Sequence, residues 1–174
     1  MKNRIIGLAI TAMALLCTSL LVSCGGDDDE TPTNQGTNTS SVDYVEPCFE
    51  WGSTMEQVKN YMAGSSWQLT FDQYMLMYTN GKATCSISYM FRGSTPGLYY
   101  AMVQYIGYSE SKLNGIVAET EKRHRTSLTK QQEIVDSKTY TQYSGNATIN
   151  GKYVGIIITS DYSTQITVIF AIPD

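Results

Sequence analysis

The feature that most constrains the fold is the alternation of apolar and polar residues over most of positions 67–107 and 139–172. This period belongs to β-strands with one buried face. Asn-Gly pairs at 80–81 and 150–151 interrupt the alternation, and this dipeptide favours two-residue type I′ hairpins. The 13 tyrosines point the same way, because Tyr favours half-buried strands. We expect strands at 67–71, 74–79, 82–92, 98–107, 139–149, 152–160 and 165–172.

Two segments have helical spacing instead. The first begins at a capping box formed by Ser53 and Glu56, and its apolar face is Met55, Val58 and Met62. The second begins near Ser109 or Ser111, and its inner face is Leu113, Ile116, Val117, Thr120 and His124. The order is helix, three or four strands, helix, three strands, which suggests a degenerate internal repeat. We therefore predict an α+β fold, an antiparallel sheet with two helices on one face.

The hairpin at Asn80-Gly81 predicts which strand residues share a face. The expected core face carries Tyr74, Leu76, Tyr78, Ala83, Cys85, Ile87, Tyr89, Phe91, Tyr99, Ala101, Val103 and Tyr105. The other face mixes Met75, Met77, Met90, Leu98, Tyr100, Met102 and Ile106 with Thr84, Ser86, Ser88 and Gln104. The simplest interpretation is that a helix or a terminal segment covers this second face. The alternative is an adaptable binding face, with Met75, Met77, Met90, Tyr100 and Met102 as candidate contact residues.

The N-terminus has the three parts of a targeting signal. Lys2 and Arg4 supply positive charge, and the apolar run 5–22 follows them. A retained membrane helix is the alternative, since 18 apolar residues nearly span a bilayer. Leu21-Val22-Ser23-Cys24 decides against it, because it resembles the bacterial lipobox. That resemblance implies cleavage before Cys24 and a covalent lipid on its sulfur, so residues 1–23 are expected to be a signal peptide and the membrane a partner through that anchor.

The residues after Cys24 give a further indication of where the protein is located. Gly25-Gly26-Asp27-Asp28-Asp29-Glu30 resembles the acidic export signal of surface lipoproteins in Bacteroidetes-type bacteria, which implies the outer membrane and its cell-surface side. A solvated acidic spacer on a periplasm-facing lipoprotein is the alternative. Residues 31–41 contain no aliphatic or aromatic side chain and cannot bury a core. We therefore expect a lipidated, flexible tether over 24–45 and a single folded domain over 46–174.

The charge of that domain argues against one class of function, and its cysteines suggest a disulfide. Residues 46–174 hold eleven acids and ten Lys or Arg residues, so they lack the basic excess of a nucleic-acid binder. Cys48 and Cys85 are an even pair in a non-cytoplasmic protein, which makes them a candidate disulfide. Two separate buried thiols are the alternative.

Catalytic and metal motifs are missing from the sequence. The single histidine, His124, lies in a basic run with no nucleophile near it, and we expect it on the surface of a helix. One histidine and two cysteines do not form the spaced ligand motif of a zinc site. No cofactor motif is present, so the covalent lipid on Cys24 is the only bound group we expect. The pairs Glu119/Glu121 and Glu133/Asp136 are the only candidates for hydrolase acids, and adjacent acids on a helix are usually solvated.

Three functions remain open. The segment Trp51–Lys59 followed by short strands resembles small Bacteroidetes-type lipoproteins, and the element order resembles β-lactamase-inhibitor-protein-like folds and small outer-membrane assembly lipoproteins. The first expectation is a non-enzymatic surface module that binds a protein or a glycan, because exposed Tyr and Trp stack on sugar rings. The alternative is a structural lipoprotein that docks on outer-membrane proteins, and a small hydrolase is the third choice.

Overall fold

The computed structural model describes residues 42–173 apart from 94–96, 136–137 and 161–163, and the expectations for residues 1–41 lie outside this part. The described chain forms a mixed α+β fold that is mostly sheet. Its elements, in chain order, are α2 (Met55–Met62), β1 (Gln68–Asp72), β2 (Met75–Thr79), β3 (Cys85–Phe91), β4 (Leu98–Ile106), α3 (Glu110–His124), β5 (Thr129–Val135), β6 (Lys138–Ile149), β7 (Lys152–Ser160) and β8 (Gln165–Ala171).

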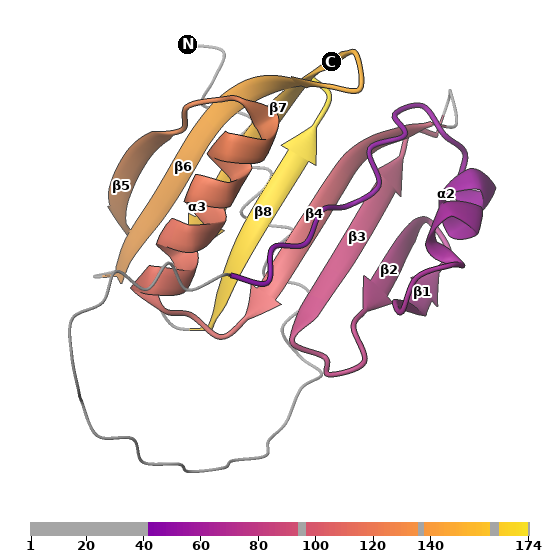
Figure 1. Ribbon diagram of the computed structural model, residues 1–174, viewed down its shortest axis with the longest axis horizontal. Coiled ribbons are helices and arrows are strands. Elements are labelled where there is room, and N and C mark those ends of the chain that lie inside the picture. The colour runs from indigo at the N-terminus through magenta and orange to yellow at the C-terminus, as the bar shows by residue number, and fades with distance from the viewer. Residues whose placement is uncertain (1–41, 94–96, 136–137, 161–163, 174) are drawn as a thin grey trace. The chain divides into compact units, whose positions relative to one another are not determined.

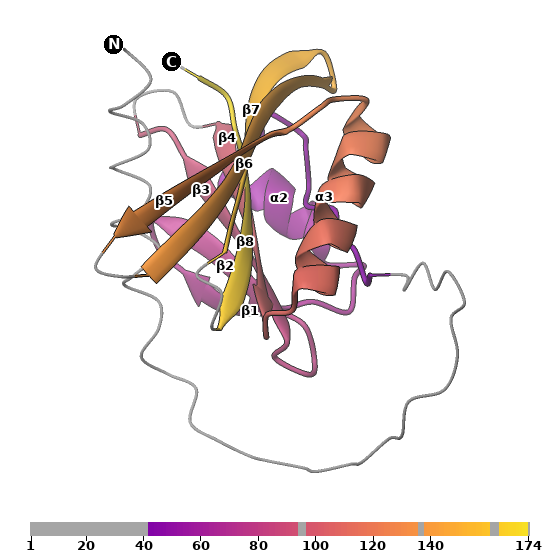
Figure 2. The ribbon, with the colours of Figure 1, turned by 90° about the vertical axis from the view of Figure 1, so that its left-hand side faces the viewer.

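All eight strands form one antiparallel sheet in the order β1-β2-β3-β4-β8-β7-β6-β5 (Figure 1). Each half of the described chain is a helix followed by a four-stranded meander, and the two meanders join where β4 pairs with β8. Both helices lie on the same side of the sheet (Figure 2). The predicted fold class is therefore confirmed, but the predicted order is wrong because the second half has four strands.

The missed strand is β5, at one edge of the sheet. Its sequence, TKQQEIV, has no alternation, because both of its sides are exposed; Ile134 is 75% exposed. An edge strand with both sides exposed needs no alternation of apolar and polar residues, so its sequence does not predict a strand.

The core lies between the helices and the sheet. It contains the predicted face of β2, β3 and β4, including Leu76, Ile87, Tyr89 and Val103. Tyr74 is the main exception, since it is 73% exposed in the turn that precedes β2. Val58 and Met62 of α2 and four residues of α3 (Leu113, Ile116, Val117 and Thr120) are buried as predicted.

The two Asn-Gly turns differ from each other. Asn150 and Gly151 both have positive φ, so this turn is the predicted two-residue hairpin, with Ile149 opposite Lys152. At Asn80 the loop is longer: the Asn80 side chain accepts hydrogen bonds from Thr84 N and Cys85 N, and Ala83 takes the left-handed conformation. A two-residue turn at Asn80-Gly81 would pair Leu76 with Cys85, whereas the longer loop pairs Leu76 with Tyr89. This shift is an even number of residues, so the predicted faces survive it.

A strap formed by Val42–Thr54 crosses the helix side of the sheet between α3 and α2 (Figure 1). Two buried tyrosine hydroxyls hold it, because Val45 N donates to Tyr105 Oη at 2.8 Å and Cys48 N donates to Tyr89 Oη at 2.9 Å. Phe49 packs edge-on against Phe170, with ring centroids 4.9 Å apart. Val42, Tyr44 and Val45, which the sequence assigns to the tether, already pack against the core.

The end of the strap also corrects the predicted capping box. Ser53 N donates to Glu50 O within the strap, and Ser53 O accepts from Leu98 N of β4. Both backbone groups of Ser53 therefore already have partners. The box consequently forms one residue later, between Thr54 and Gln57. The second helix begins at the predicted N-cap, Ser109.

Candidate functional site

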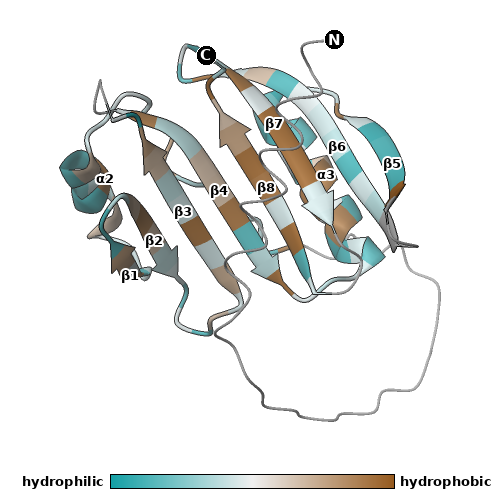
Figure 3. Ribbon diagram, turned by 180° about the vertical axis from the view of Figure 1, so that it is seen from behind, coloured by the Kyte–Doolittle hydropathy of each residue, from teal (hydrophilic) through white to brown (hydrophobic). Residues whose placement is uncertain are grey.

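The side of the sheet opposite the helices faces the viewer in Figure 3. Three cross-strand rows of residues on this side form what we call the open face. Each row has one residue from each of β2, β3, β4, β8 and β7, in that order. The first row is Met75, Met90, Tyr100, Ala171 and Gly155; the second is Met77, Ser88, Met102, Ile169 and Ile157; the third is Thr79, Ser86, Gln104, Thr167 and Thr159.

The open face contains no charged residue in these three rows. The first two rows are mainly apolar, and the third row is polar and neutral. Lys, Glu, Arg and Asp are mostly found on protein surfaces, and a large contiguous apolar area without them marks an interaction site. This composition makes the open face the strongest candidate for a functional surface in the described part of the chain.

All five predicted binding residues lie together on this face. Met75, Met90 and Tyr100 are consecutive in the first row, and Met77 and Met102 flank Ser88 in the second. Leu98 was also expected here but belongs to the core, because a bulge after Met90 changes its side of the sheet. The sequence missed Ile157, Thr167 and Ile169, because β8 pairs with β4 through residues that are distant in the sequence, such as Tyr100 with Ala171.

Cover by a helix, the simpler of the two sequence interpretations, is not what the described residues provide. Both described helices and the strap pack on the opposite side. The side chains at the centre of the open face are nevertheless shielded: Met102 is 6% exposed and Ile169 is 2% exposed. The Ser88 hydroxyl is buried without a hydrogen-bond partner among the described residues.

The large aromatic residues in the described part of the chain do not form a stacking surface for a sugar. Trp51 and Trp67 are half-buried and pack against the core. The exposed tyrosines are Tyr61, Tyr74 and Tyr153, which belong to α2, the β1–β2 turn and β7. Because these rings are distributed over separate elements, they do not build one platform.

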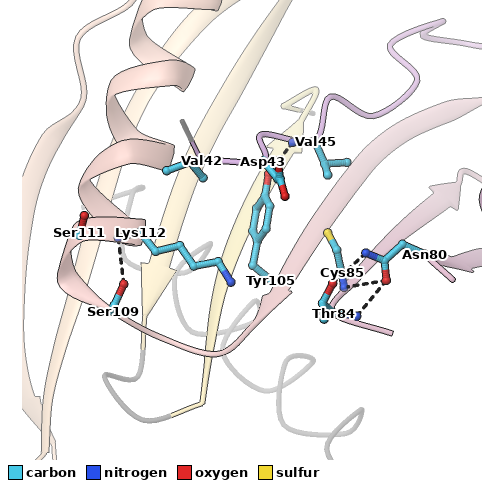
Figure 4. A pocket seen from close by; sticks show the side chains of 10 residues that line it. All are labelled: Val42, Asp43, Val45, Asn80, Thr84, Cys85, Tyr105, Ser109, Ser111 and Lys112. Carbon is cyan, nitrogen blue, oxygen red and sulfur yellow. Dashed lines mark hydrogen bonds between the residues drawn. The ribbon is translucent and has the colours of Figure 1, made fainter. Parts of the chain in front are cut away.

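A pocket of about 410 Å³ lies on the helix side, where the strap, the start of α3 and the first residues of β3 meet (Figure 4). Its polar groups are used within the protein. Lys112 Nζ donates to the carbonyls of Ile106 and Gly107 at 2.8 and 3.2 Å, and the Tyr105 hydroxyl accepts from the strap. Burial raises the pKa of the Cys85 thiol to about 12, which leaves it protonated and a poor nucleophile.

Cys48 and Cys85 are both free and buried, which is the second of the two arrangements expected from the sequence. Cys48 N bonds to the Tyr89 hydroxyl, whereas Cys85 lies four residues before Tyr89 on β3.

His124 is more enclosed than a helix-surface residue. Its ring lies edge-on to Phe49 and to Phe170, with centroids 5.5 and 5.3 Å away. Its Nε2 is 3.4 Å from the Tyr44 hydroxyl. Burial lowers the pKa of His124, and the nearby Glu46 carboxylate opposes this only in part. The neighbouring cation is also occupied, because Arg123 pairs with Glu46 and Glu119 at 3.0 and 3.1 Å.

This environment predicts a pH effect on stability. Because the folded-state pKa of His124 lies below the unfolded value of about 6.5, the neutral ring favours the folded state. Its contribution is complete above that value and decreases as the pH falls through the lower, folded pKa. The melting temperature of the natural chain should therefore fall more between pH 7 and pH 5 than that of His124→Gln, measured by circular dichroism. Equal falls in the two proteins would show that His124 does not titrate in this way.

Glu119 and Glu121, the first pair of candidate acids, make separate contacts. Glu119 binds Lys122 and Arg123, while Glu121 accepts a hydrogen bond from Leu128 N at 2.7 Å. Asp136 lies outside the described residues. Within the described ranges, no group of three or more His, Cys, Asp or Glu side chains could hold a metal ion. No helix in these ranges is long and apolar enough to cross a membrane.

Comparison with protein-family models and with curated proteins finds no match to this chain.

Proposed function

We propose that this chain is an outer-membrane lipoprotein whose folded part binds a partner protein through the open face. The observation that carries the proposal is the fifteen-residue neutral surface on five adjacent strands, with apolar side chains in two of its three rows. The partner must present a similarly uncharged surface, because a charge buried against these side chains would lose its hydration without compensation.

The membrane address rests on the sequence. A positive N-terminus, an apolar run and a lipobox-like cysteine occur at the spacing of a lipoprotein signal. The acidic segment 27–30 resembles the export signal of surface lipoproteins, and we therefore propose the cell-surface side of the outer membrane. Two or three acyl chains on Cys24 would hold the protein there, since each buried CH₂ contributes about 0.8 kcal/mol.

A protein partner fits the open face better than a glycan does. Sugars are bound by exposed aromatic rings with hydrogen-bonding side chains around them. On the open face the one aromatic residue in the three rows is Tyr100, so these rows offer a single ring. Methionine side chains are flexible and adapt to irregular apolar surfaces of other proteins.

The same surface also suits the second candidate, a structural lipoprotein docked on another outer-membrane protein. The two candidates differ in where the domain lies. Protease treatment of intact cells should remove a surface-displayed domain and spare one that faces the periplasm.

The open face can be tested by photo-crosslinking in intact cells. A photo-reactive residue placed at Ile157 on the open face should give a discrete crosslinked product. The same residue at Lys122, on the exposed side of α3, should not. Adding Met77→Lys should lower the yield of the Ile157 product about tenfold or more, because an unpaired ammonium group would be buried at the interface.

The matched control is Ala118→Lys, which adds the same charge at an exposed position of α3. This control should leave the crosslink at Ile157 unchanged, and the melting temperature of each variant shows whether the fold is intact. A product of equal yield from both crosslinking positions, or a product from Lys122 alone, would assign the interaction to another surface.

A further inference from the structure

Methionines are concentrated on one part of the open face. Six methionines lie in the described part of the chain, and two of these, Met55 and Met62, belong to α2. The other four are Met75, Met77, Met90 and Met102, on the neighbouring strands β2, β3 and β4.

Three of these four surround one small residue. Met77 and Met102 are the direct cross-strand neighbours of Ser88, on its two sides. Adjacent strands are about 5 Å apart, and Met90 is two positions along β3, about 7 Å away. A methionine side chain has three rotatable bonds, so three thioethers at these distances can converge over Ser88.

The Ser88 hydroxyl is a buried polar group at the centre of these methionines. Ser88 is 1% exposed, and its Oγ has no hydrogen-bond partner among the described residues. Buried polar atoms are nearly always paired, so an orphaned one requires an explanation such as an ion. Tyrosine hydroxyls contact two of the three sulfurs, since Tyr100 donates to Met102 Sδ at 3.6 Å and Tyr99 donates to Met90 Sδ at 4.0 Å, and a bound ion would replace these contacts.

The charge of the surroundings selects the class of ion. The three rows contain neither carboxylate nor imidazole, the ligands that Mg²⁺, Ca²⁺ and Zn²⁺ require. Neutral thioethers are soft ligands and prefer Cu(I). A monovalent ion also brings less uncompensated charge into a neutral surface than a divalent ion does.

We propose that Met77, Met90 and Met102 bind one soft monovalent metal ion, Cu(I) or its analogue Ag(I), above Ser88. The site goes beyond the proposed docking function, and it does not depend on that function. Bound metal would also join β2, β3 and β4 through their side chains.

Titration with Ag(I) tests the site, since this ion does not change its oxidation state. The full chain, labelled with ¹³C at the methionine methyl groups and kept in detergent, is followed by NMR. The methyl signals of Met77, Met90 and Met102 should shift together and reach their end point after one ion has bound at these residues. The signals of Met55 and Met62 should not move, and Zn(II) should move none of them.

Two variants separate the site from other silver-binding groups. The triple variant M77L/M90L/M102L keeps the side-chain volumes and should bind one Ag(I) fewer per chain than the natural protein. Ser88→Val keeps all the thioethers but fills the space between them, and it should abolish the coupled methyl shifts. M55L/M62L is the matched control and should bind as many ions as the natural chain, because the cysteine thiols are the same in every protein.

The result that would overturn the proposal is silver uptake equal in the natural chain and the triple variant, with no shift at Met77, Met90 or Met102. Loss of partner crosslinking with silver binding intact would overturn the docking function alone. Loss of silver binding with crosslinking intact would overturn the metal site alone.

Discussion

Replacing Phe49 by alanine should lower the free energy of unfolding by about 3–5 kcal/mol, the range for removing a buried aromatic side chain. Phe49 is 7% exposed and lies against Phe170, His124 and Trp51, so alanine leaves a cavity between the strap and β8. The rings around that cavity belong to different elements and cannot close it by a small shift. For a domain of this size we expect the melting temperature to fall by more than about 10 °C.

The measurement is urea unfolding followed by circular dichroism and by tryptophan fluorescence. Tyr153→Ala is the control, because Tyr153 is 59% exposed and should change the stability by less than about 0.5 kcal/mol. If Phe49→Ala were as stable as this control, the strap would not be part of the core.

Replacing Cys24 by serine should remove all covalent lipid from the protein. Serine has no thiol to accept the diacylglyceryl group, and cleavage before residue 24 should fail with it. Cells grown with labelled palmitate should give a labelled, processed natural protein and an unlabelled Cys24→Ser protein of precursor size. The label and the size decide the outcome, because the uncut apolar segment 5–22 can itself hold a precursor at the membrane.

Cys17→Ser is the matched control for this experiment. It removes a thiol from the same segment, seven residues earlier, and should be labelled and cut like the natural chain. Palmitate uptake by Cys24→Ser, or equal loss of label in both variants, would disprove attachment at Cys24.

Period-two alternation was enough to predict the antiparallel sheet and the buried sides of β2, β3 and β4. β2 alternates between buried and half-buried residues, and the residues of β3 and β4 that face the helices are consistently apolar or aromatic, so the sequence carries the pattern. The same logic explains the failure at β5, which buries neither side. The loop at Asn80 was misjudged for a different reason: the Asn80 side chain bonds to two backbone amides, and a dipeptide rule does not include such bonds.

The candidate site was predictable only in part. Met75, Met77, Met90, Tyr100 and Met102 could be placed on one face, because they belong to consecutive strands with a local register. Their continuation through Ile169 and Ile157 depends on the pairing of β4 with β8, which no local pattern encodes. The role of His124 was also hidden, since its aromatic neighbours Phe49 and Phe170 are distant in the sequence.

The strap places the first described residues in the path of any mechanical load that arrives from the N-terminus. Its bonds from Val45, Cys48 and Gly52 follow one another along the chain. A force applied at Val42 would therefore break these hydrogen bonds one after another rather than all together. Peeling the twelve residues up to Ser53 would release about 40 Å of extended chain before the sheet itself carried tension. Under such a load the strap would thus extend before the sheet does.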